Sequence, residues 1–114
     1  MNNRIEVNLT TRRLSYFEGD QLVKEYSVGV GKASTPTPVG HHYIVKKLAD
    51  QQDIPVGLGT RWMHLSAGNS CIHGTNDDNS VEGYVSGGCI RMHNEDIEDL
   101  FEKVAINTPV IVTE

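Results

Sequence analysis

Apolar and polar residues alternate through the first thirty residues of the chain, and this pattern restricts the possible folds more than any other feature. Side chains of a β-strand point alternately to its two faces, so a period of two predicts strands with one buried face. The positions on that face are Ile5, Val7, Leu9, Leu14, Tyr16, Val28 and Val30. Gly19 and Asp20 lie between two such runs and predict a hairpin turn, because both residues tolerate unusual backbone angles.

The remaining segments predict further short strands separated by loops. Residues 29–42, 49–59 and 75–88 are rich in Gly, Pro, Asp or Asn or have no apolar period, which is typical of loops. Strands are predicted at residues 42–48 ("HYIVKKL"), 61–66 ("RWMHLS"), 70–74 ("SCIHG") and 108–114 ("TPVIVTE").

One helix is predicted near the C-terminus, at residues 94–104 ("NEDIEDLFEKV"). Its apolar residues follow the spacing of a buried helical face, and Asn94 is the expected N-terminal cap. Many short strands with a single helix indicate a mostly β protein, either a β-sandwich or a barrel-like fold. A length of 114 residues gives room for one core, so residues 1–114 are expected to form a single domain.

Composition excludes several classes of function. Asp and Glu outnumber Lys and Arg by 15 to 10, which argues against a nucleic-acid partner. The longest apolar runs are far shorter than the roughly 18 residues that a membrane span requires. The first residues, Met-Asn-Asn-Arg-Ile, contain no apolar signal-peptide core. The chain is therefore expected to be cytoplasmic, a mature fragment, or exported by another route.

Two glycines precede Cys89 in "SGGCIRM" (residues 86–92), and His73 lies in "IHGT" (residues 72–75). Glycines allow a sharp turn that points backbone N–H groups into one space, as an oxyanion hole requires. A nucleophilic cysteine needs a nearby imidazolium to hold its thiolate, and His73 is the leading candidate. The carbonyl group of Gly74 is a possible partner for its second ring nitrogen. The alternative is that Cys89 is a small buried apolar residue.

These motifs resemble the catalytic domain of the L,D-transpeptidases, the YkuD-type family of cell-wall enzymes. The resemblance rests on "IHGT", on "SGGCIRM" with its cysteine sixteen residues after His73, and on "STPTPVG" (residues 34–40). It covers nearly the whole chain. It implies that Cys89 is the nucleophile, His73 the base, and Gly74 the residue whose carbonyl orients the base. It also places Ser86, Gly87, Gly88, Arg91 and Tyr84 at or near the substrate.

The roles of Gly87 and Arg91 have more than one interpretation. Gly87 stands where the family often has histidine, so the substrate contact expected there is in doubt. Arg91 either holds a substrate carboxylate or forms a structural ion pair. Tyr84 is expected to contact substrate as part of a lid. Trp62 either lines a peptide groove or packs in the core or at the rim.

The resemblance also implies an activity. In this family a cysteine thiolate attacks a tetrapeptide stem of peptidoglycan, expels the terminal D-alanine and forms a thioester. An amine of another stem then completes a 3–3 cross-link, whereas water or a free D-amino acid would give carboxypeptidase or exchange activity. The expected partners are peptidoglycan stem peptides, with no cofactor and no metal. The expected state is a monomer in the cell envelope, in the periplasm or the cell wall.

Two other classes of function fit parts of the same sequence. Cys71, His73, Cys89 and His93 together offer the ligand types of a structural zinc site. A non-catalytic peptidoglycan-binding module would keep the fold without turnover. Cys71 also raises a question of its own, because residues 71 and 73 of a strand share a face. Cys71 is then either a small buried residue or a thiol able to form a disulfide with Cys89.

Overall fold

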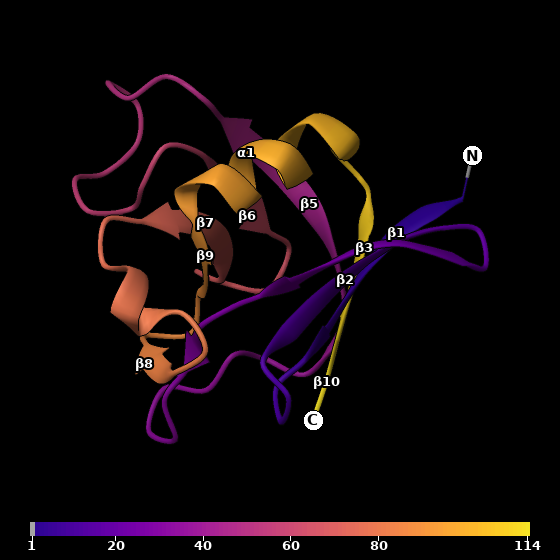
Figure 1. Cartoon of the computed structure of the whole chain (residues 1–114), viewed down its shortest axis with the longest axis horizontal. Coiled ribbons are helices and arrows are strands. Elements are labelled where there is room, and N and C mark those ends of the chain that lie inside the picture. Colours follow the sequence, from indigo (N-terminus) through magenta and orange to yellow (C-terminus); the bar gives the residue numbers. More distant parts are fainter. Residues whose placement is uncertain (1) are drawn as a thin grey trace.

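The protein consists of short strands, one α-helix and one 3-10 helix (Figure 1). The computed structural model describes residues 2–114, except for the side chains of Val85 and Ser86. The strands are β1 (Asn3–Asn8), β2 (Arg13–Glu18), β3 (Gln21–Ser27), β4 (Val30–Gly31), β5 (Gly40–Leu48), β6 (Trp62–Leu65), β7 (Cys71–Thr75), β8 (Tyr84–Ser86), β9 (Ile90–His93) and β10 (Pro109–Thr113). The helices are η1 (Asp78–Ser80) and α1 (Asn94–Lys103).

Eight strands form one mixed sheet in the order β3-β2-β1-β10-β5-β6-β7-β9, which curves into a barrel-like shape. Most neighbouring strands are antiparallel, but β1 pairs with β10 and β7 pairs with β9 in parallel. Strands β4 and β8 form a separate parallel pair. The prediction of a mostly β, barrel-like fold with one α-helix near the C-terminus is therefore confirmed.

The period-two pattern predicts the N-terminal strands correctly. Ile5, Val7, Leu14 and Tyr16 are at most 1% exposed and belong to the hydrophobic core. Gly19 has a φ of 60° at the turn between β2 and β3, in the left-handed region that favours glycine. The loop at residues 49–59 and the strands β5, β6, β7 and β10 also agree with the predictions.

Two of the predicted loops contain regular structure. Residues 29–42 include β4 and the start of β5, and residues 75–88 include η1 and β8. Strand β9, which follows Cys89, was not predicted. Strands of two to four residues next to glycines show no measurable period, and β4 and β8 are defined only by pairing with each other. Local pattern therefore cannot detect them.

Helix α1 matches the predicted helix but begins differently. His93 occupies the N-cap position and makes no capping hydrogen bond through its side chain. Asn94, the predicted cap, is the first helical residue, and its Oδ1 accepts a hydrogen bond from the backbone N–H of Thr60. The helix lies against β7 and β9 (Figure 1), and buries Ile97 and Leu100. No helix within residues 2–114 is long and apolar enough to cross a membrane.

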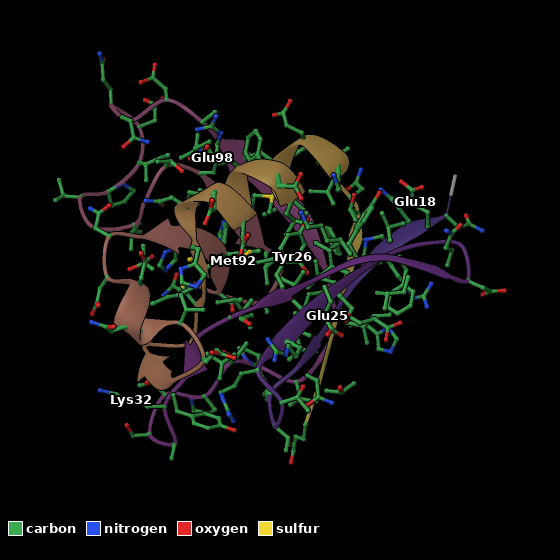
Figure 2. The ribbon with its side chains drawn as sticks, in the orientation of Figure 1. Glu18, Glu25, Tyr26, Lys32, Met92 and Glu98 are labelled. Carbon is green, nitrogen blue, oxygen red and sulfur yellow. The ribbon has the colours of Figure 1, made fainter. Side chains whose placement is uncertain are left out.

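A charged cluster fastens α1 to β3. The hydroxyl group of Tyr26 donates to the carboxylate of Asp99 at 2.6 Å, and Lys24 and Lys103 approach the same carboxylate at 3.0 and 3.2 Å. Figure 2 shows Tyr26 close to the helix. These contacts, led by the Tyr26 hydroxyl, lower the pKa of Asp99 from 3.8 to about 2. The cluster favours the docked position of α1, which in turn packs against β7.

The substitution Tyr26→Phe tests this attachment. We expect it to lower the free energy of unfolding by about 1 kcal/mol, below the usual value for a charged hydrogen bond because Asp99 is partly exposed. The folded-state pKa of Asp99 is depressed, so its contribution is complete above about pH 4 and is lost as the pH falls towards about 2.

The difference in stability between wild type and Tyr26→Phe should therefore narrow over that pH range, as measured by urea unfolding. Tyr43→Phe is the matched control, since Tyr43 is 48% exposed. Equal losses of stability in the two variants would contradict the attachment.

Candidate active site

The parallel pairing of β7 with β9 determines which side chains meet. Ile72 lies opposite Ile90, and both are fully buried on the core side. His73 lies opposite Arg91 in the same register. Side chains alternate along a strand, so Cys71 and His73 share the other face of β7, as their two-residue spacing predicts. Cys89 comes directly before β9, one step back from Ile90, and therefore faces Cys71.

Cys71, His73 and Cys89 form a compact group, which we call the Cys–His cluster. Their sulfur and nitrogen atoms all lie within 4.8 Å of one another. Cys71 and His73 are each 3% exposed, whereas Cys89 is only partly buried. The cluster therefore has one thiol that solvent can reach and two groups behind it.

The backbone of the next residue fixes the imidazole of His73. Its Nδ1 lies 2.5 Å from the carbonyl oxygen of Gly74. A carbonyl oxygen only accepts hydrogen bonds, so Nδ1 carries the proton and donates it. This leaves Nε2 for the hydrogen bond between His73 and Cys89. The arrangement supplies the orientation that a carboxylate gives to the histidine of other nucleophile–base pairs.

The surroundings of Cys89 favour its thiolate. The pKa of Cys89 is lowered to about 5 by all its contacts together, and a hydrogen bond from Cys71 is the largest influence. Burial acts in the opposite direction, and the hydrogen bond and charge of His73 lower the pKa further. When protonated, Cys89 can donate to the carbonyl oxygen of Asn69, which lies 3.6 Å from its Sγ. The thiolate instead depends on Cys71 and His73.

Cys71 keeps the shared proton. Its pKa is raised, first by the hydrogen bond to Cys89 and then by burial. The side chain of Trp62 also hydrogen-bonds to Cys71, and its indole N–H can only donate. A chain of hydrogen bonds therefore runs from Trp62 through Cys71 to Cys89. The sequence indicates neither this chain nor the role of Trp62 in it.

Gly74 has no room for a side chain. A Cβ atom there would collide with Oδ1 of Asn94 and come within 3.1 Å of Cγ2 of Ile97. Gly59, with a φ of 75°, packs against the same backbone from the preceding loop. These contacts hold the Gly74 carbonyl in place. No local sequence signal identifies Gly59 or Asn94, because they meet Gly74 only in the folded chain.

The glycines before Cys89 differ from each other. Gly88 is buried with a φ of +118°, and its carbonyl accepts a 3.1 Å hydrogen bond from the Ser70 hydroxyl. Gly87 is exposed, with nothing within 4 Å of its absent Cβ. The side chain of Ser86 lies outside the described part of the structure.

A groove of ≈ 410 Å³ runs beside these glycines. Its walls include Pro36 and Pro38 from the "STPTPVG" segment and Asn69 and Ser70 from the loop before β7. Three residues that line this groove adjoin the two cysteines in the chain: Ser70 precedes Cys71, and Gly87 and Gly88 precede Cys89.

Tyr84 lines a different groove. This second groove, of ≈ 690 Å³, shares Pro36 and Pro38 with the first. The Tyr84 hydroxyl donates to the carbonyl oxygen of Leu9 and accepts from Arg12, each at 2.9 Å. Tyr84 is thus held on the turn between β1 and β2, outside the residues that line the first groove.

Arg91 and His93 have distinct surroundings. Arg91 shares a face with His73, and the ion pairs among the described residues do not include its guanidinium. Nδ1 of His93 lies 2.8 Å from a carboxylate oxygen of Asp78. Within the described residues, the group with metal-ligand geometry contains Cys71, His73 and Cys89 but not His93. The four-ligand zinc site is therefore not assembled, because His93 lies four residues beyond Cys89, in a contact with η1.

Comparison with known proteins places this geometry in a family. The sequence profile of the L,D-transpeptidase catalytic domain (YkuD) matches residues 2–112. The chain belongs to this family. Proteins named L,D-transpeptidase YkuD from Bacillus licheniformis and Bacillus subtilis are 44% and 38% identical to it. These alignments cover 96% and 95% of this chain but 65% and 64% of those proteins.

Solved structures of L,D-transpeptidases superpose closely on this chain. The NMR structure of the catalytic domain from the Enterococcus faecium L,D-transpeptidase superposes with a TM-score of 0.83 at 26% identity. That alignment covers 99% of this chain and 98% of the other. A crystal structure of a mutant E. faecium L,D-transpeptidase gives a TM-score of 0.86 at 25% identity, covering 99% and 50%. The chain thus spans just under two thirds of the two Bacillus relatives and matches an isolated catalytic domain along nearly its full length.

The close packing at Gly74 leads to a prediction for Gly74→Ala. The added methyl group must displace Asn94 or the Gly74 backbone, which should lower the free energy of unfolding by about 1–3 kcal/mol. Movement of the carbonyl should also slow the alkylation of Cys89 by iodoacetamide. Gly87→Ala is the control, because its methyl group enters open space, and its effect on stability should stay within about 0.5 kcal/mol. Similar unfolding curves for the two variants would argue against the contact.

The contacts of Cys89 predict an unusual pH dependence of its alkylation. A lowered pKa keeps the thiolate present as the pH falls, so the rate should decline only as the pH approaches about 5. In His73→Ala the pKa should rise, and the rate near pH 6 should fall by about tenfold or more.

The measurement is the rate of iodoacetamide addition to Cys89, followed by mass spectrometry of the peptide. His41→Ala serves as control, because His41 is exposed on β5. An unchanged pH profile in His73→Ala would show that His73 does not stabilise the thiolate.

Proposed function

We propose that this protein is a peptidoglycan L,D-transpeptidase in which Cys89 is the nucleophile. The observation that carries the proposal is the Cys–His cluster: a partly exposed thiol with a lowered pKa beside a histidine fixed by a backbone carbonyl. Membership of the family supplies the class of reaction and of substrate.

The first step is acylation of Cys89. Its thiolate attacks the carbonyl carbon of the third residue in a tetrapeptide stem, and the negative charge moves to the carbonyl oxygen. We assign stabilisation of that oxygen to the backbone at Gly88, where the φ of +118° shapes the turn before the nucleophile. His73 gives a proton to the departing amine, and its Nδ1 stays bonded to Gly74 throughout. Terminal D-alanine leaves and a thioester remains.

The second step is transfer to an amine. His73, now neutral, takes a proton from the side-chain amine of a second stem as that amine attacks the thioester. The amide bond forms, the carbon–sulfur bond breaks, and the Cys89 thiolate is regenerated. The contacts that lower the pKa of Cys89 also make its thiolate a good leaving group in this step.

The grooves suggest where the stems bind. We assign the donor stem to the groove of ≈ 410 Å³, because it is lined by Gly87 and Gly88, which directly precede Cys89. Arg91 shares the face of His73 and has no ion-pair partner among the described residues, so we assign it to a carboxylate of the stem. With Gly87 in place of a histidine, the wall of this groove is backbone at that point. With this substrate, we expect the protein to act in the cell envelope.

Analysis of the products from a purified disaccharide-tetrapeptide tests the proposal. The wild-type protein should release D-alanine and form a 3–3 cross-linked dimer, identified by mass spectrometry. Cys89→Ala should give no dimer and no acyl-enzyme, since it lacks the attacking sulfur. A folded Cys89→Ala that still forms the dimer would exclude Cys89 as the nucleophile.

The same assay distinguishes the acceptors. Attack by water gives a tripeptide product, and attack by an added D-amino acid gives an exchanged tetrapeptide. His41→Ala is the matched control. His41 lies on β5, away from the Cys–His cluster, so this variant should give the wild-type product pattern. If the folded wild-type protein formed only tripeptide, the enzyme would be an L,D-carboxypeptidase.

A further inference from the structure

We propose that Cys71 and Cys89 form a modification site, at which a peroxide converts the two thiols into an intramolecular disulfide. The modification would switch off the thiol reversibly. The effect on activity rests on the proposed function of Cys89, whereas formation of the disulfide does not. The proposed acyl-transfer mechanism forms no bond to Cys71, although this residue lies directly beside Cys89.

The sheet already places the two cysteines side by side. In the parallel register of β7 and β9, Ile72 faces Ile90, so one step back Cys71 faces Cys89. Adjacent strands lie about 4.8 Å apart, and a disulfide requires Cα atoms roughly 4.4–6.8 Å apart. The two sulfur atoms lie within 4.8 Å and share a hydrogen bond. The disulfide therefore needs a rotation of the side chains and no rearrangement of the strands.

The exposure of the two thiols determines which of them is oxidised first. Cys89 is partly exposed and directly follows Gly88, which lines the groove of ≈ 410 Å³, whereas Cys71 is 3% exposed. A small oxidant therefore meets Cys89 first, and the thiolate is the form that reacts with it. Cys71 needs no access to solvent, because its partner is already beside it.

The chemistry balances with a peroxide as the oxidant. The Cys89 thiolate attacks one oxygen of hydrogen peroxide, the O–O bond breaks, and hydroxide leaves, which gives a sulfenic acid on Cys89. The sulfur of Cys71 then attacks the sulfur of Cys89 and breaks its S–O bond. The hydroxyl group leaves with the Cys71 proton as water. Two thiol sulfurs lose two electrons in total, and one peroxide is reduced to one water and one hydroxide.

Oxidation of Cys89 also prepares Cys71 to react. The hydrogen bond to the Cys89 sulfur is the first cause of the raised pKa of Cys71. A sulfenic acid carries no negative charge at that sulfur, so the attraction that keeps the proton on Cys71 weakens once Cys89 is oxidised. The Trp62 indole N–H, which hydrogen-bonds to Cys71 and lowers its pKa, remains in place. Cys71 is thus a poor nucleophile before oxidation and a better one after it.

Peptide mapping of the folded protein tests the disulfide without an activity assay. The protein is treated with hydrogen peroxide in the presence of a chelator, so that no metal ion bridges the cluster, and remaining thiols are blocked with N-ethylmaleimide. The segment from Trp62 to Arg91 contains no internal Lys or Arg, so trypsin alone leaves both cysteines in one peptide. Additional cleavage after Glu82 separates residues 62–82 from residues 83–91. We expect the two peptides to remain joined until dithiothreitol is added.

The substitution Cys71→Ser supplies the functional comparison, with the activity of each protein expressed relative to its own untreated sample. After peroxide and then dithiothreitol, the wild type should recover its activity. In Cys71→Ser, Cys89 should proceed to sulfinic or sulfonic acid, and the recovered fraction should be about tenfold lower. Cys71→Ala replaces Cys71→Ser if the serine variant does not fold.

Several outcomes would overturn the proposal. Unlinked peptides 62–82 and 83–91 from peroxide-treated wild type would do so, as would a disulfide found only between two protein molecules. Equal recovery in wild type and Cys71→Ser would show that Cys71 does not protect Cys89. If the peptides are joined but no protein shows transpeptidation, the disulfide stands and the proposed function fails.

Discussion

Strands β7 and β9 are parallel, with Ile72 opposite Ile90, and the chemistry of the site depends on this register. The two isoleucines are fully buried, so a slip of β9 by one residue would turn Ile90 away from the core and expose apolar surface. The same slip would separate Cys89 from His73. Packing of the hydrophobic core on one face therefore fixes the alignment of the reactive groups on the other.

Helix α1 connects this pair of strands to the rest of the fold. It begins immediately after β9, and Asn94 and Ile97 press against the backbone of Gly74. Further along the helix, Asp99 accepts a hydrogen bond from Tyr26 of β3, a strand at the opposite edge of the sheet. The helix thus connects the two edges of the curved sheet. The Gly74 carbonyl group, which orients His73, is therefore held in place by residues that are distant in the sequence.

The sequence predicts most strands and the helix, because a period of two or of 3.6 survives wherever one face is buried across several residues. It does not reveal β4, β8 or β9, which are short and exist through pairing with distant segments. At the site, motifs predict which residues gather, since "IHGT" and "SGGCIRM" each have a distinctive composition. Gly59, Asn94 and the indole of Trp62 escape prediction, because their contacts arise only from tertiary packing.

The alternation of side chains along a strand has a chemical consequence at position 71. A residue two places before His73 must share its face, and the parallel register then sets it opposite Cys89. Any side chain at this position enters the environment of the proposed nucleophile. An apolar residue would raise the pKa of Cys89 through desolvation alone, leaving His73 as the main opposing influence. Cysteine instead donates a hydrogen bond to the thiolate, and it brings a second oxidisable sulfur to the same place. The pKa of Cys89 and the sensitivity to oxidants proposed for it therefore both depend on one residue.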